Sequence, residues 1–118
     1  MPRLGKSERL KSSREFKAVF QQCRKWEDRL FLFYVQFVED PKIRKFGVSL
    51  GRALGKAHQR NRLKRRLREI YRVEKERFRG GYQVILIPRR ACVDRAYEEL
   101  RQSFLELSKK AGLLPRMR

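Results

Sequence analysis

Basic side chains are concentrated between residues 52 and 72, a segment with nine basic residues and one acidic residue, Glu69. If this segment is helical, with about 100° per residue, its cations gather on one arc, while Leu63, Leu67 and Ile70 fall outside it. The polar side chains on that arc are Arg60, Asn61, Lys64, Arg65, Arg68 and Arg72. Guanidinium groups bind phosphate through pairs of parallel hydrogen bonds. The pattern therefore predicts a surface that binds a polyanion.

The spacing of these cations is unusual for a face that only meets water. Arg60, Lys64 and Arg68 follow one another at steps of four residues, where like charges on a helix repel. The whole chain of 118 residues has 32 basic and 13 acidic residues, a formal net charge of +19. Nucleic acid is the favoured partner, ahead of an anionic membrane, which usually binds an amphipathic helix rather than a mixed domain. A basic protein without a polyanionic partner remains the plain alternative.

Aromatic side chains form a second candidate site. Phe16 and Phe20 share one face of an expected helix, and Tyr34 lies on the more polar face of an expected strand. Packing in the core is the more common fate of such residues, but they could instead stack on unpaired bases. The cations that could follow the backbone of such a ligand are Arg14, Arg52 and Lys56.

The chain has no motif typical of a protein active site. It lacks a Walker loop, a GxGxxG loop and an HExxH helix, and its single histidine, His58, has no carboxylate beside it in sequence. Cys23 and Cys92 are far apart and outside any CxxC pair, so we expect buried thiols rather than a disulfide or a metal site. The sequence therefore predicts no catalytic residue, no protein-borne metal and no small-molecule substrate.

Helices and strands alternate along the chain. The expected elements are a helix from Ser12 or Ser13, strands over 30–38 and 45–50, a helix over 57–79, a strand over 82–87, and a helix from about 94 to 112. The first two strands are expected to form a hairpin, and Asp94 to cap the last helix. The basic arm 1–11 and the tail 113–118 are expected to be loosely ordered. The order α-β-β-α-β-α predicts an α+β protein, a two-layer α/β sandwich in a single domain over 1–118.

The chain contains no apolar run of about 18 residues, so we expect no membrane span. Residues 1–10 lack the apolar core of a secretory signal, which favours the cytoplasm.

Residues 57–68, AHQRNRLKRRLR, resemble the signature helix of the bacterial ribonuclease P protein subunit. The family pattern of Ala, two residues, Arg-Asn-Arg, an apolar residue, Lys-Arg, any residue, an apolar residue and Arg is complete here. The segment 47–50 with Arg52, and the series Phe16, Phe20 and Tyr34, are also similar to that family. The resemblance covers roughly residues 9–110.

The resemblance implies a small basic protein that binds a large catalytic RNA. The resulting ribonucleoprotein endonuclease removes the 5′ leader of precursor tRNA, and its active site and Mg²⁺ ions are held mainly by the RNA subunit. The residues implied to line a cleft for the single-stranded leader are Arg14, Phe16, Phe20, Tyr34, Ser49 and Arg52. The residues implied to face the RNA subunit are Lys56, Arg60, Asn61, Arg62, Lys64, Arg65 and Arg68. The family also has a left-handed βαβ crossover around this helix.

Two other functions compete with this one. A structural ribosomal protein would also be small, basic and α/β. A double-stranded DNA binder would place the basic helix in the major groove, although duplex bases cannot stack on the aromatic residues.

Overall fold

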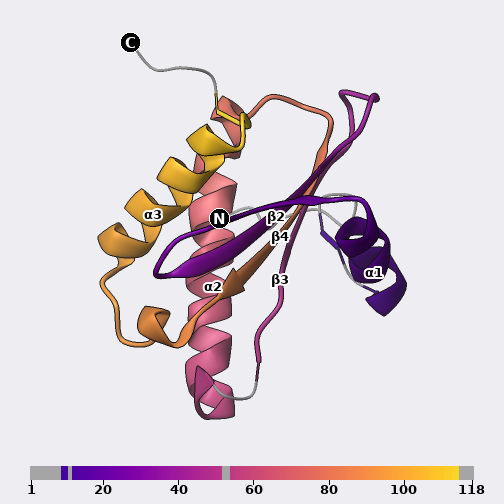
Figure 1. Cartoon of the computed structure of the whole chain (residues 1–118). Coiled ribbons are helices and arrows are strands. Elements are labelled where there is room, and N and C mark those ends of the chain that lie inside the picture. The colour runs from indigo at the N-terminus through magenta and orange to yellow at the C-terminus, as the bar shows by residue number, and fades with distance from the viewer. Residues whose placement is uncertain (1–8, 11, 52–53, 115–118) are drawn as a thin grey trace.

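The computed structural model describes residues 9–10, 12–51 and 54–114. Its elements are α1 (Ser13–Gln21), β1 (Arg24–Glu27), β2 (Phe31–Phe37), β3 (Arg44–Val48), α2 (Ala57–Glu74), η3 (Lys75–Arg77), β4 (Tyr82–Pro88), η4 (Arg90–Cys92) and α3 (Tyr97–Lys110), where η marks a short 3-10 helix (Figure 1). This mixture of helices and one sheet confirms the expected α+β class. No helix within these residues is long and apolar enough to cross a membrane.

The four strands form one sheet in the order β1-β2-β4-β3. β2 pairs antiparallel with both β1 and β4, and β3 pairs parallel with β4. The expected hairpin between segments 30–38 and 45–50 is therefore wrong, because β4 lies between them. β2 and β4 are apolar on both faces and take the central positions, while β3 begins with Arg44 and Lys45 and lies at the edge. β3, α2 and β4 form a βαβ unit whose left-handed crossover stays a prediction.

Strand β1 was absent from the expected elements because its sequence, RKWE, is short and polar. Only Trp26 in this strand is partly buried, as is usual for an edge strand that buries little surface. Neither its composition nor its length distinguishes it from a loop.

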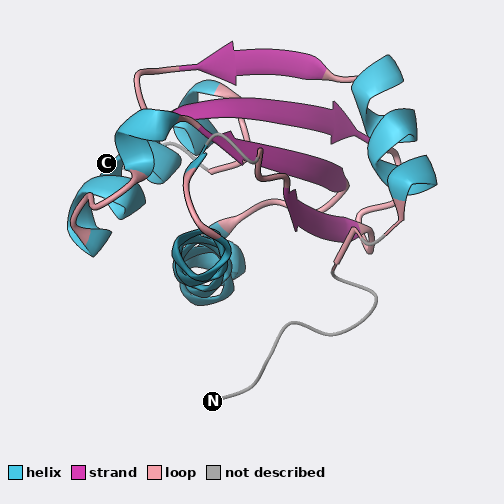
Figure 2. Cartoon of the chain, turned by 90° about the horizontal axis from the view of Figure 1, so that it is seen from below, coloured by secondary structure: helices cyan, strands magenta, loops and turns pink. Residues whose placement is uncertain are grey.

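The two faces of the sheet are covered by different helices. One face of β2, with Phe31, Phe33 and Val35, packs in the main core with Leu67 of α2 and Phe104 of α3. The other face is covered in part by α1, whose buried Val19 packs in a smaller cluster with Ile85 of β4. Figure 1 shows α3 and α1 on opposite sides of the sheet, and Figure 2 shows α2 nearly end-on.

The helix ends follow the sequence signals in one case and depart from them in two. The Ser12–Glu15 capping box before α1 is present, as expected. Asp94 does not cap α3, because its φ of 66° places it in the left-handed region and the helix begins three residues later, at Tyr97. The helix expected to reach residue 79 ends at Glu74 and continues only as η3.

Both ends of the described chain are better packed than the sequence suggests. Leu10 is buried, and its backbone N–H donates a hydrogen bond of 3.2 Å to the Phe46 carbonyl. Leu113 and Leu114 are buried, and the Leu113 carbonyl accepts a hydrogen bond of 2.9 Å from the Arg79 N–H. These positions pack against the rest of the protein, while the looseness expected of the arm and the tail stays a prediction. The remainder of both segments lies outside the described residues.

Candidate nucleic-acid interface

Helix α2 separates an apolar face from a cationic face, as its sequence period predicts. Leu63, Leu67 and Ile70 are buried against the sheet, while Asn61 and Arg65 are exposed. Lys64 and Arg68 are partly buried, and Tyr71 is fully buried. The core thus holds α2 in an orientation that leaves its cations accessible.

Hydrogen bonds hold the start of α2 in place. The Gln59 side chain accepts a hydrogen bond of 2.9 Å from the Lys56 N–H, and Arg60 donates one of 2.6 Å from Nη1 to the Gly55 carbonyl. Arg60 therefore has a structural contact as well as a place in the cationic row.

Two basic residues of α2, Arg72 and Arg62, differ in their surroundings from Lys64, Arg65 and Arg68. Arg72 binds Glu69 through Nε and Nη2 at 3.0 and 2.6 Å, and this hydrogen-bonded pair lowers the pKa of Glu69. Arg62 lines a different hollow, of about 300 Å³, between α2 and the segment that precedes α3.

A shallow hollow of about 520 Å³ lies along the cationic face of α2. Its lining residues are His58, Asn61, Lys64, Arg65 and Arg68. Partial burial, followed by the nearby charges of Arg68 and Arg9, lowers the pKa of Lys64. Within the described residues, no carboxylate forms an ion pair with Lys64 or Arg68. These cations repel one another, and an anion in the hollow would relieve that repulsion.

A second open hollow, of about 490 Å³, lies between α1 and the end of β3. Its lining residues are Ser13, Phe16, Lys17, Phe20, Val48, Ser49 and Leu50. We call it the aromatic hollow. The structure thus brings together Phe16, Phe20 and Ser49, three of the residues expected in a leader-binding cleft, and their role in binding RNA stays a prediction.

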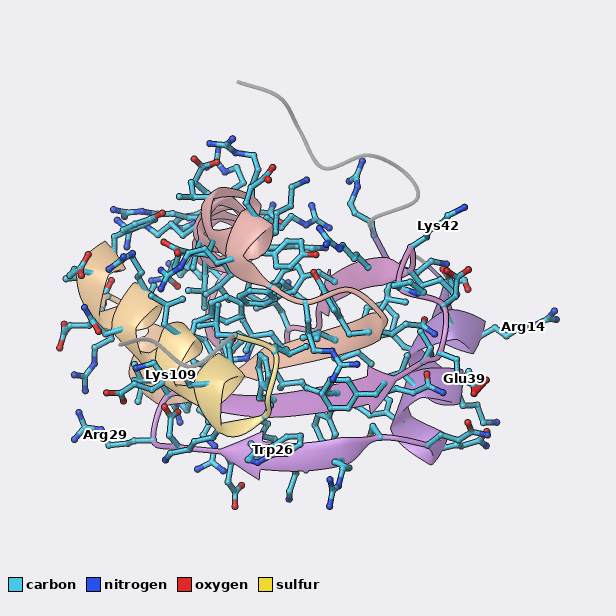
Figure 3. All side chains as sticks on the ribbon, turned by 90° about the horizontal axis from the view of Figure 1, so that it is seen from above. Arg14, Trp26, Arg29, Glu39, Lys42 and Lys109 are labelled. Atoms are coloured by element: carbon cyan, nitrogen blue, oxygen red, sulfur yellow. The ribbon has the colours of Figure 1, made fainter. Side chains whose placement is uncertain are left out.

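The other expected cleft residues have different places. Tyr34 does not line the aromatic hollow but supports Phe20 in an edge-to-face contact, with ring centroids 4.9 Å apart. Arg14 projects from α1 away from the sheet (Figure 3) and does not line the hollow. Arg52 lies outside the described residues.

Gly47 allows α1 to approach β3 closely enough to shape the aromatic hollow. A Cβ atom at this position would lie 2.8 Å from Cζ of Phe16 and 3.0 Å from Cβ of Leu10. The absence of a side chain at Gly47 therefore lets the Phe16 ring rest against the strand.

Ser13 and Lys17 line the aromatic hollow but were not among the expected site residues. Ser13, Lys17 and Phe20 are spaced by four and three residues, so helical periodicity places them on one face. Lys17 brings a cation to the rim of the aromatic residues, a position suited to a phosphate beside a stacked base.

Comparison with proteins of known sequence shows which family this chain is similar to. The family model described as "Ribonuclease P" matches residues 4–112. The "Ribonuclease P protein component" of Symbiobacterium thermophilum is 42% identical over 113 residues, covering 96% of this chain and 98% of the relative. The protein of the same name from Clostridium kluyveri is 33% identical over 107 residues, covering 89% and 95%.

Solved structures agree with the sequence comparisons. The RNase P protein of Staphylococcus aureus superposes with a TM-score of 0.81 at 25% identity, over 93% of this chain and 100% of that one. The RNase P protein of Thermotoga maritima superposes with a TM-score of 0.79 at 28% identity, over 87% and 96%. Sequence and fold together show that this chain belongs to the ribonuclease P protein family.

Proposed function

We propose that this chain is the RNA-binding protein subunit of ribonuclease P and helps the catalytic RNA remove the 5′ leader of precursor tRNA in the cytoplasm. The observation that carries the proposal is the presence of two different hollows on one small protein. One is lined by the cations of α2, and the other by the aromatic rings of α1. They lie close along the chain, since Leu50 lines the aromatic hollow and Lys56 is the N-cap residue of α2.

The cationic hollow suits the phosphates of a folded RNA. Arg65 and Asn61 are exposed on α2, and both line this hollow. Arginine can bind one phosphate through two hydrogen bonds, and the Asn61 amide can pair with a base edge or a 2′-hydroxyl. We assign this face to the RNA subunit.

The aromatic hollow suits an unpaired strand. Phe20 is 40% exposed, so one part of its ring is free to stack on a base, while Lys17 and Ser49 offer polar contacts beside it. A base within a duplex is already stacked on both sides. The hollow therefore favours the single-stranded leader over the folded body of tRNA.

In this proposal the chain binds and positions its RNA partners, while phosphodiester hydrolysis takes place in the RNA subunit. Mg²⁺ prefers carboxylate and phosphate oxygens as ligands, and the cationic face of α2 repels it. In the part of the chain that the structure describes, no group of three or more His, Cys, Asp and Glu side chains could hold a metal ion. We therefore assign the Mg²⁺ ions mainly to the RNA subunit, as the resemblance implies.

Reconstitution tests the proposal. The protein is mixed with a bacterial ribonuclease P RNA at low Mg²⁺, and release of the 5′ leader from precursor tRNA is measured. The expected result is faster release with protein than with RNA alone, and a loss of that stimulation for Arg65→Ala. Lys109→Ala, which removes an exposed cation at the end of α3, is the matched control and should behave as the unaltered protein.

The opposite result would be an absence of stimulation by the unaltered protein, or equal losses for Arg65→Ala and Lys109→Ala. Stoichiometric co-purification with ribosomal RNA would instead support a structural ribosomal protein. No observation on the fold or the site favours that alternative.

A further inference from the structure

The segment before α1 forms part of the same cationic surface as α2. Arg9 forms an isolated parallel β-bridge with Phe46, outside the edge of β3. The bridge is supported by the hydrogen bond from the Leu10 N–H to the Phe46 carbonyl. This short contact extends the sheet by one further position beyond β3.

The alternation of side chains along an extended chain directs Arg9 toward α2. Leu10 packs on the α1 side of the sheet with Val19 and Ile85. Its neighbour Arg9 must therefore lie on the opposite side, beside its bridge partner Phe46. Phe46 faces α2 on that side, because its ring stacks on Tyr71 with centroids 4.3 Å apart.

Two further observations describe the surroundings of Arg9, which has no ion pair with a carboxylate of the described residues. The charge of Arg9 contributes to the lowered pKa of both Lys64 and Arg68, after the larger effect of their burial. The Nε atom of Arg9 is buried and has no hydrogen-bond partner. A buried, unsatisfied donor calls for an acceptor, and residues 9–10, 12–51 and 54–114 do not provide one.

We propose that Arg9, Lys64 and Arg68 form one phosphate-binding subsite, which takes a backbone phosphate of the ribonuclease P RNA. The identity of the RNA rests on the proposed function above, whereas the binding of phosphate does not. A single phosphate accepts hydrogen bonds from the guanidinium and ammonium groups at once and neutralises their repulsion. The residues just before α1 thereby become part of the RNA interface, although the signature pattern begins only at Ala57.

Thermal unfolding tests the subsite without any RNA. The probe is inorganic phosphate, compared with chloride at equal ionic strength. The test variant is Arg9→Met, which keeps an apolar stem. The matched control is Arg29→Met, which removes the same charge from an exposed residue between β1 and β2, at the edge of the sheet opposite β3.

At about ten times the dissociation constant of the subsite, phosphate should raise Tm by about 5 °C. That increment should be retained by Arg29→Met and largely lost in Arg9→Met. In chloride, Arg9→Met should melt at or above the Tm of the unaltered protein, since one of three repelling cations is gone. A purely structural Arg9 would instead lower Tm equally in both salts and leave the phosphate increment intact, and that result would overturn the subsite.

Binding to the RNA subunit then tests the assignment of the phosphate. Arg9→Met should weaken binding to ribonuclease P RNA about tenfold near 0.1 M salt and reduce the slope of log K against log salt by about 1. Arg29→Met should change neither. The assignment to the RNA subunit would be overturned by a different combination of results. In that case phosphate would raise Tm of the unaltered protein but not of Arg9→Met, and Arg9→Met would lose affinity only for precursor tRNA. Failure of the proposed function would be seen separately, as absence of stimulated leader release by the unaltered protein.

Discussion

Phe20 on α1 is the side chain through which the aromatic hollow can be tested most directly. Phe20 is 40% exposed, and its ring contacts that of Tyr34 edge to face, with centroids 4.9 Å apart. Phe20→Ala removes this contact, which should cost about 0.5–1.5 kcal/mol of stability. It also removes the surface on which a base would stack, which is worth about 1–3 kcal/mol of binding. The expected loss of affinity for a bound leader is therefore about 5- to 150-fold.

The assay compares two RNAs with the reconstituted holoenzyme. Dissociation constants are measured for precursor tRNA with a single-stranded leader and for mature tRNA without one. Phe20→Ala should weaken binding of the first and leave binding of the second unchanged. Phe20→Trp should restore much of the affinity, since an indole offers a larger stacking surface.

Tyr97→Ala is the matched control, because it removes a ring of similar exposure, 36%, from the start of α3. It should leave the difference between the two RNAs intact. Equal losses of affinity for precursor and mature tRNA in Phe20→Ala would refute the reasoning, because the ring would then act on the tRNA body or on assembly. Retention of full affinity by Phe20→Ala would refute it as well.

Three further predictions concern the scaffold. Gly47→Ala should lower the free energy of unfolding by about 1–3 kcal/mol in urea titrations, since the new Cβ would lie 2.8 Å from Phe16 Cζ; an unchanged midpoint would contradict the close approach. Burial raises the pKa of Cys92 to about 12, so only about one thiol in ten thousand is ionised at pH 8. Mass spectrometry should find Cys92 alkylated by iodoacetamide only after unfolding, whereas rapid alkylation of the native protein would contradict its burial. Arg101→Met should lower the free energy of unfolding by about 1–3 kcal/mol, since Glu74 is only 5% exposed and would lose the 3.0 Å hydrogen bond that Arg101 donates to it. A loss of stability no greater than that of Lys109→Met would contradict a stabilising role for this hydrogen bond.

Local features of this protein follow from its sequence because they depend on residues close together in the chain. The apolar and cationic faces of α2 arise from the helical period alone, so Leu67 is buried and Arg65 exposed as the pattern predicts. The capping box of Ser12 and Glu15 closes over three residues and is equally local. The charge of +19 favours a nucleic acid as partner, and the resemblance of residues 57–68 to a known family implies that this nucleic acid is RNA.

Pairings between distant segments depend instead on the whole sheet. Strand β4 follows α2 in the sequence but lies between β2 and β3 in the sheet. No residue near position 45 indicates that a strand starting at Tyr82 will take this place. The aromatic hollow likewise depends on the approach of Phe16 to Gly47, which are separated by two strands. The position of Arg9 on the α2 side of the sheet has the same origin, because it depends on the bridge to Phe46, a residue far along the chain. Such contacts are selected by the burial of both faces of the central strands, a property of the assembled fold rather than of any short stretch of residues.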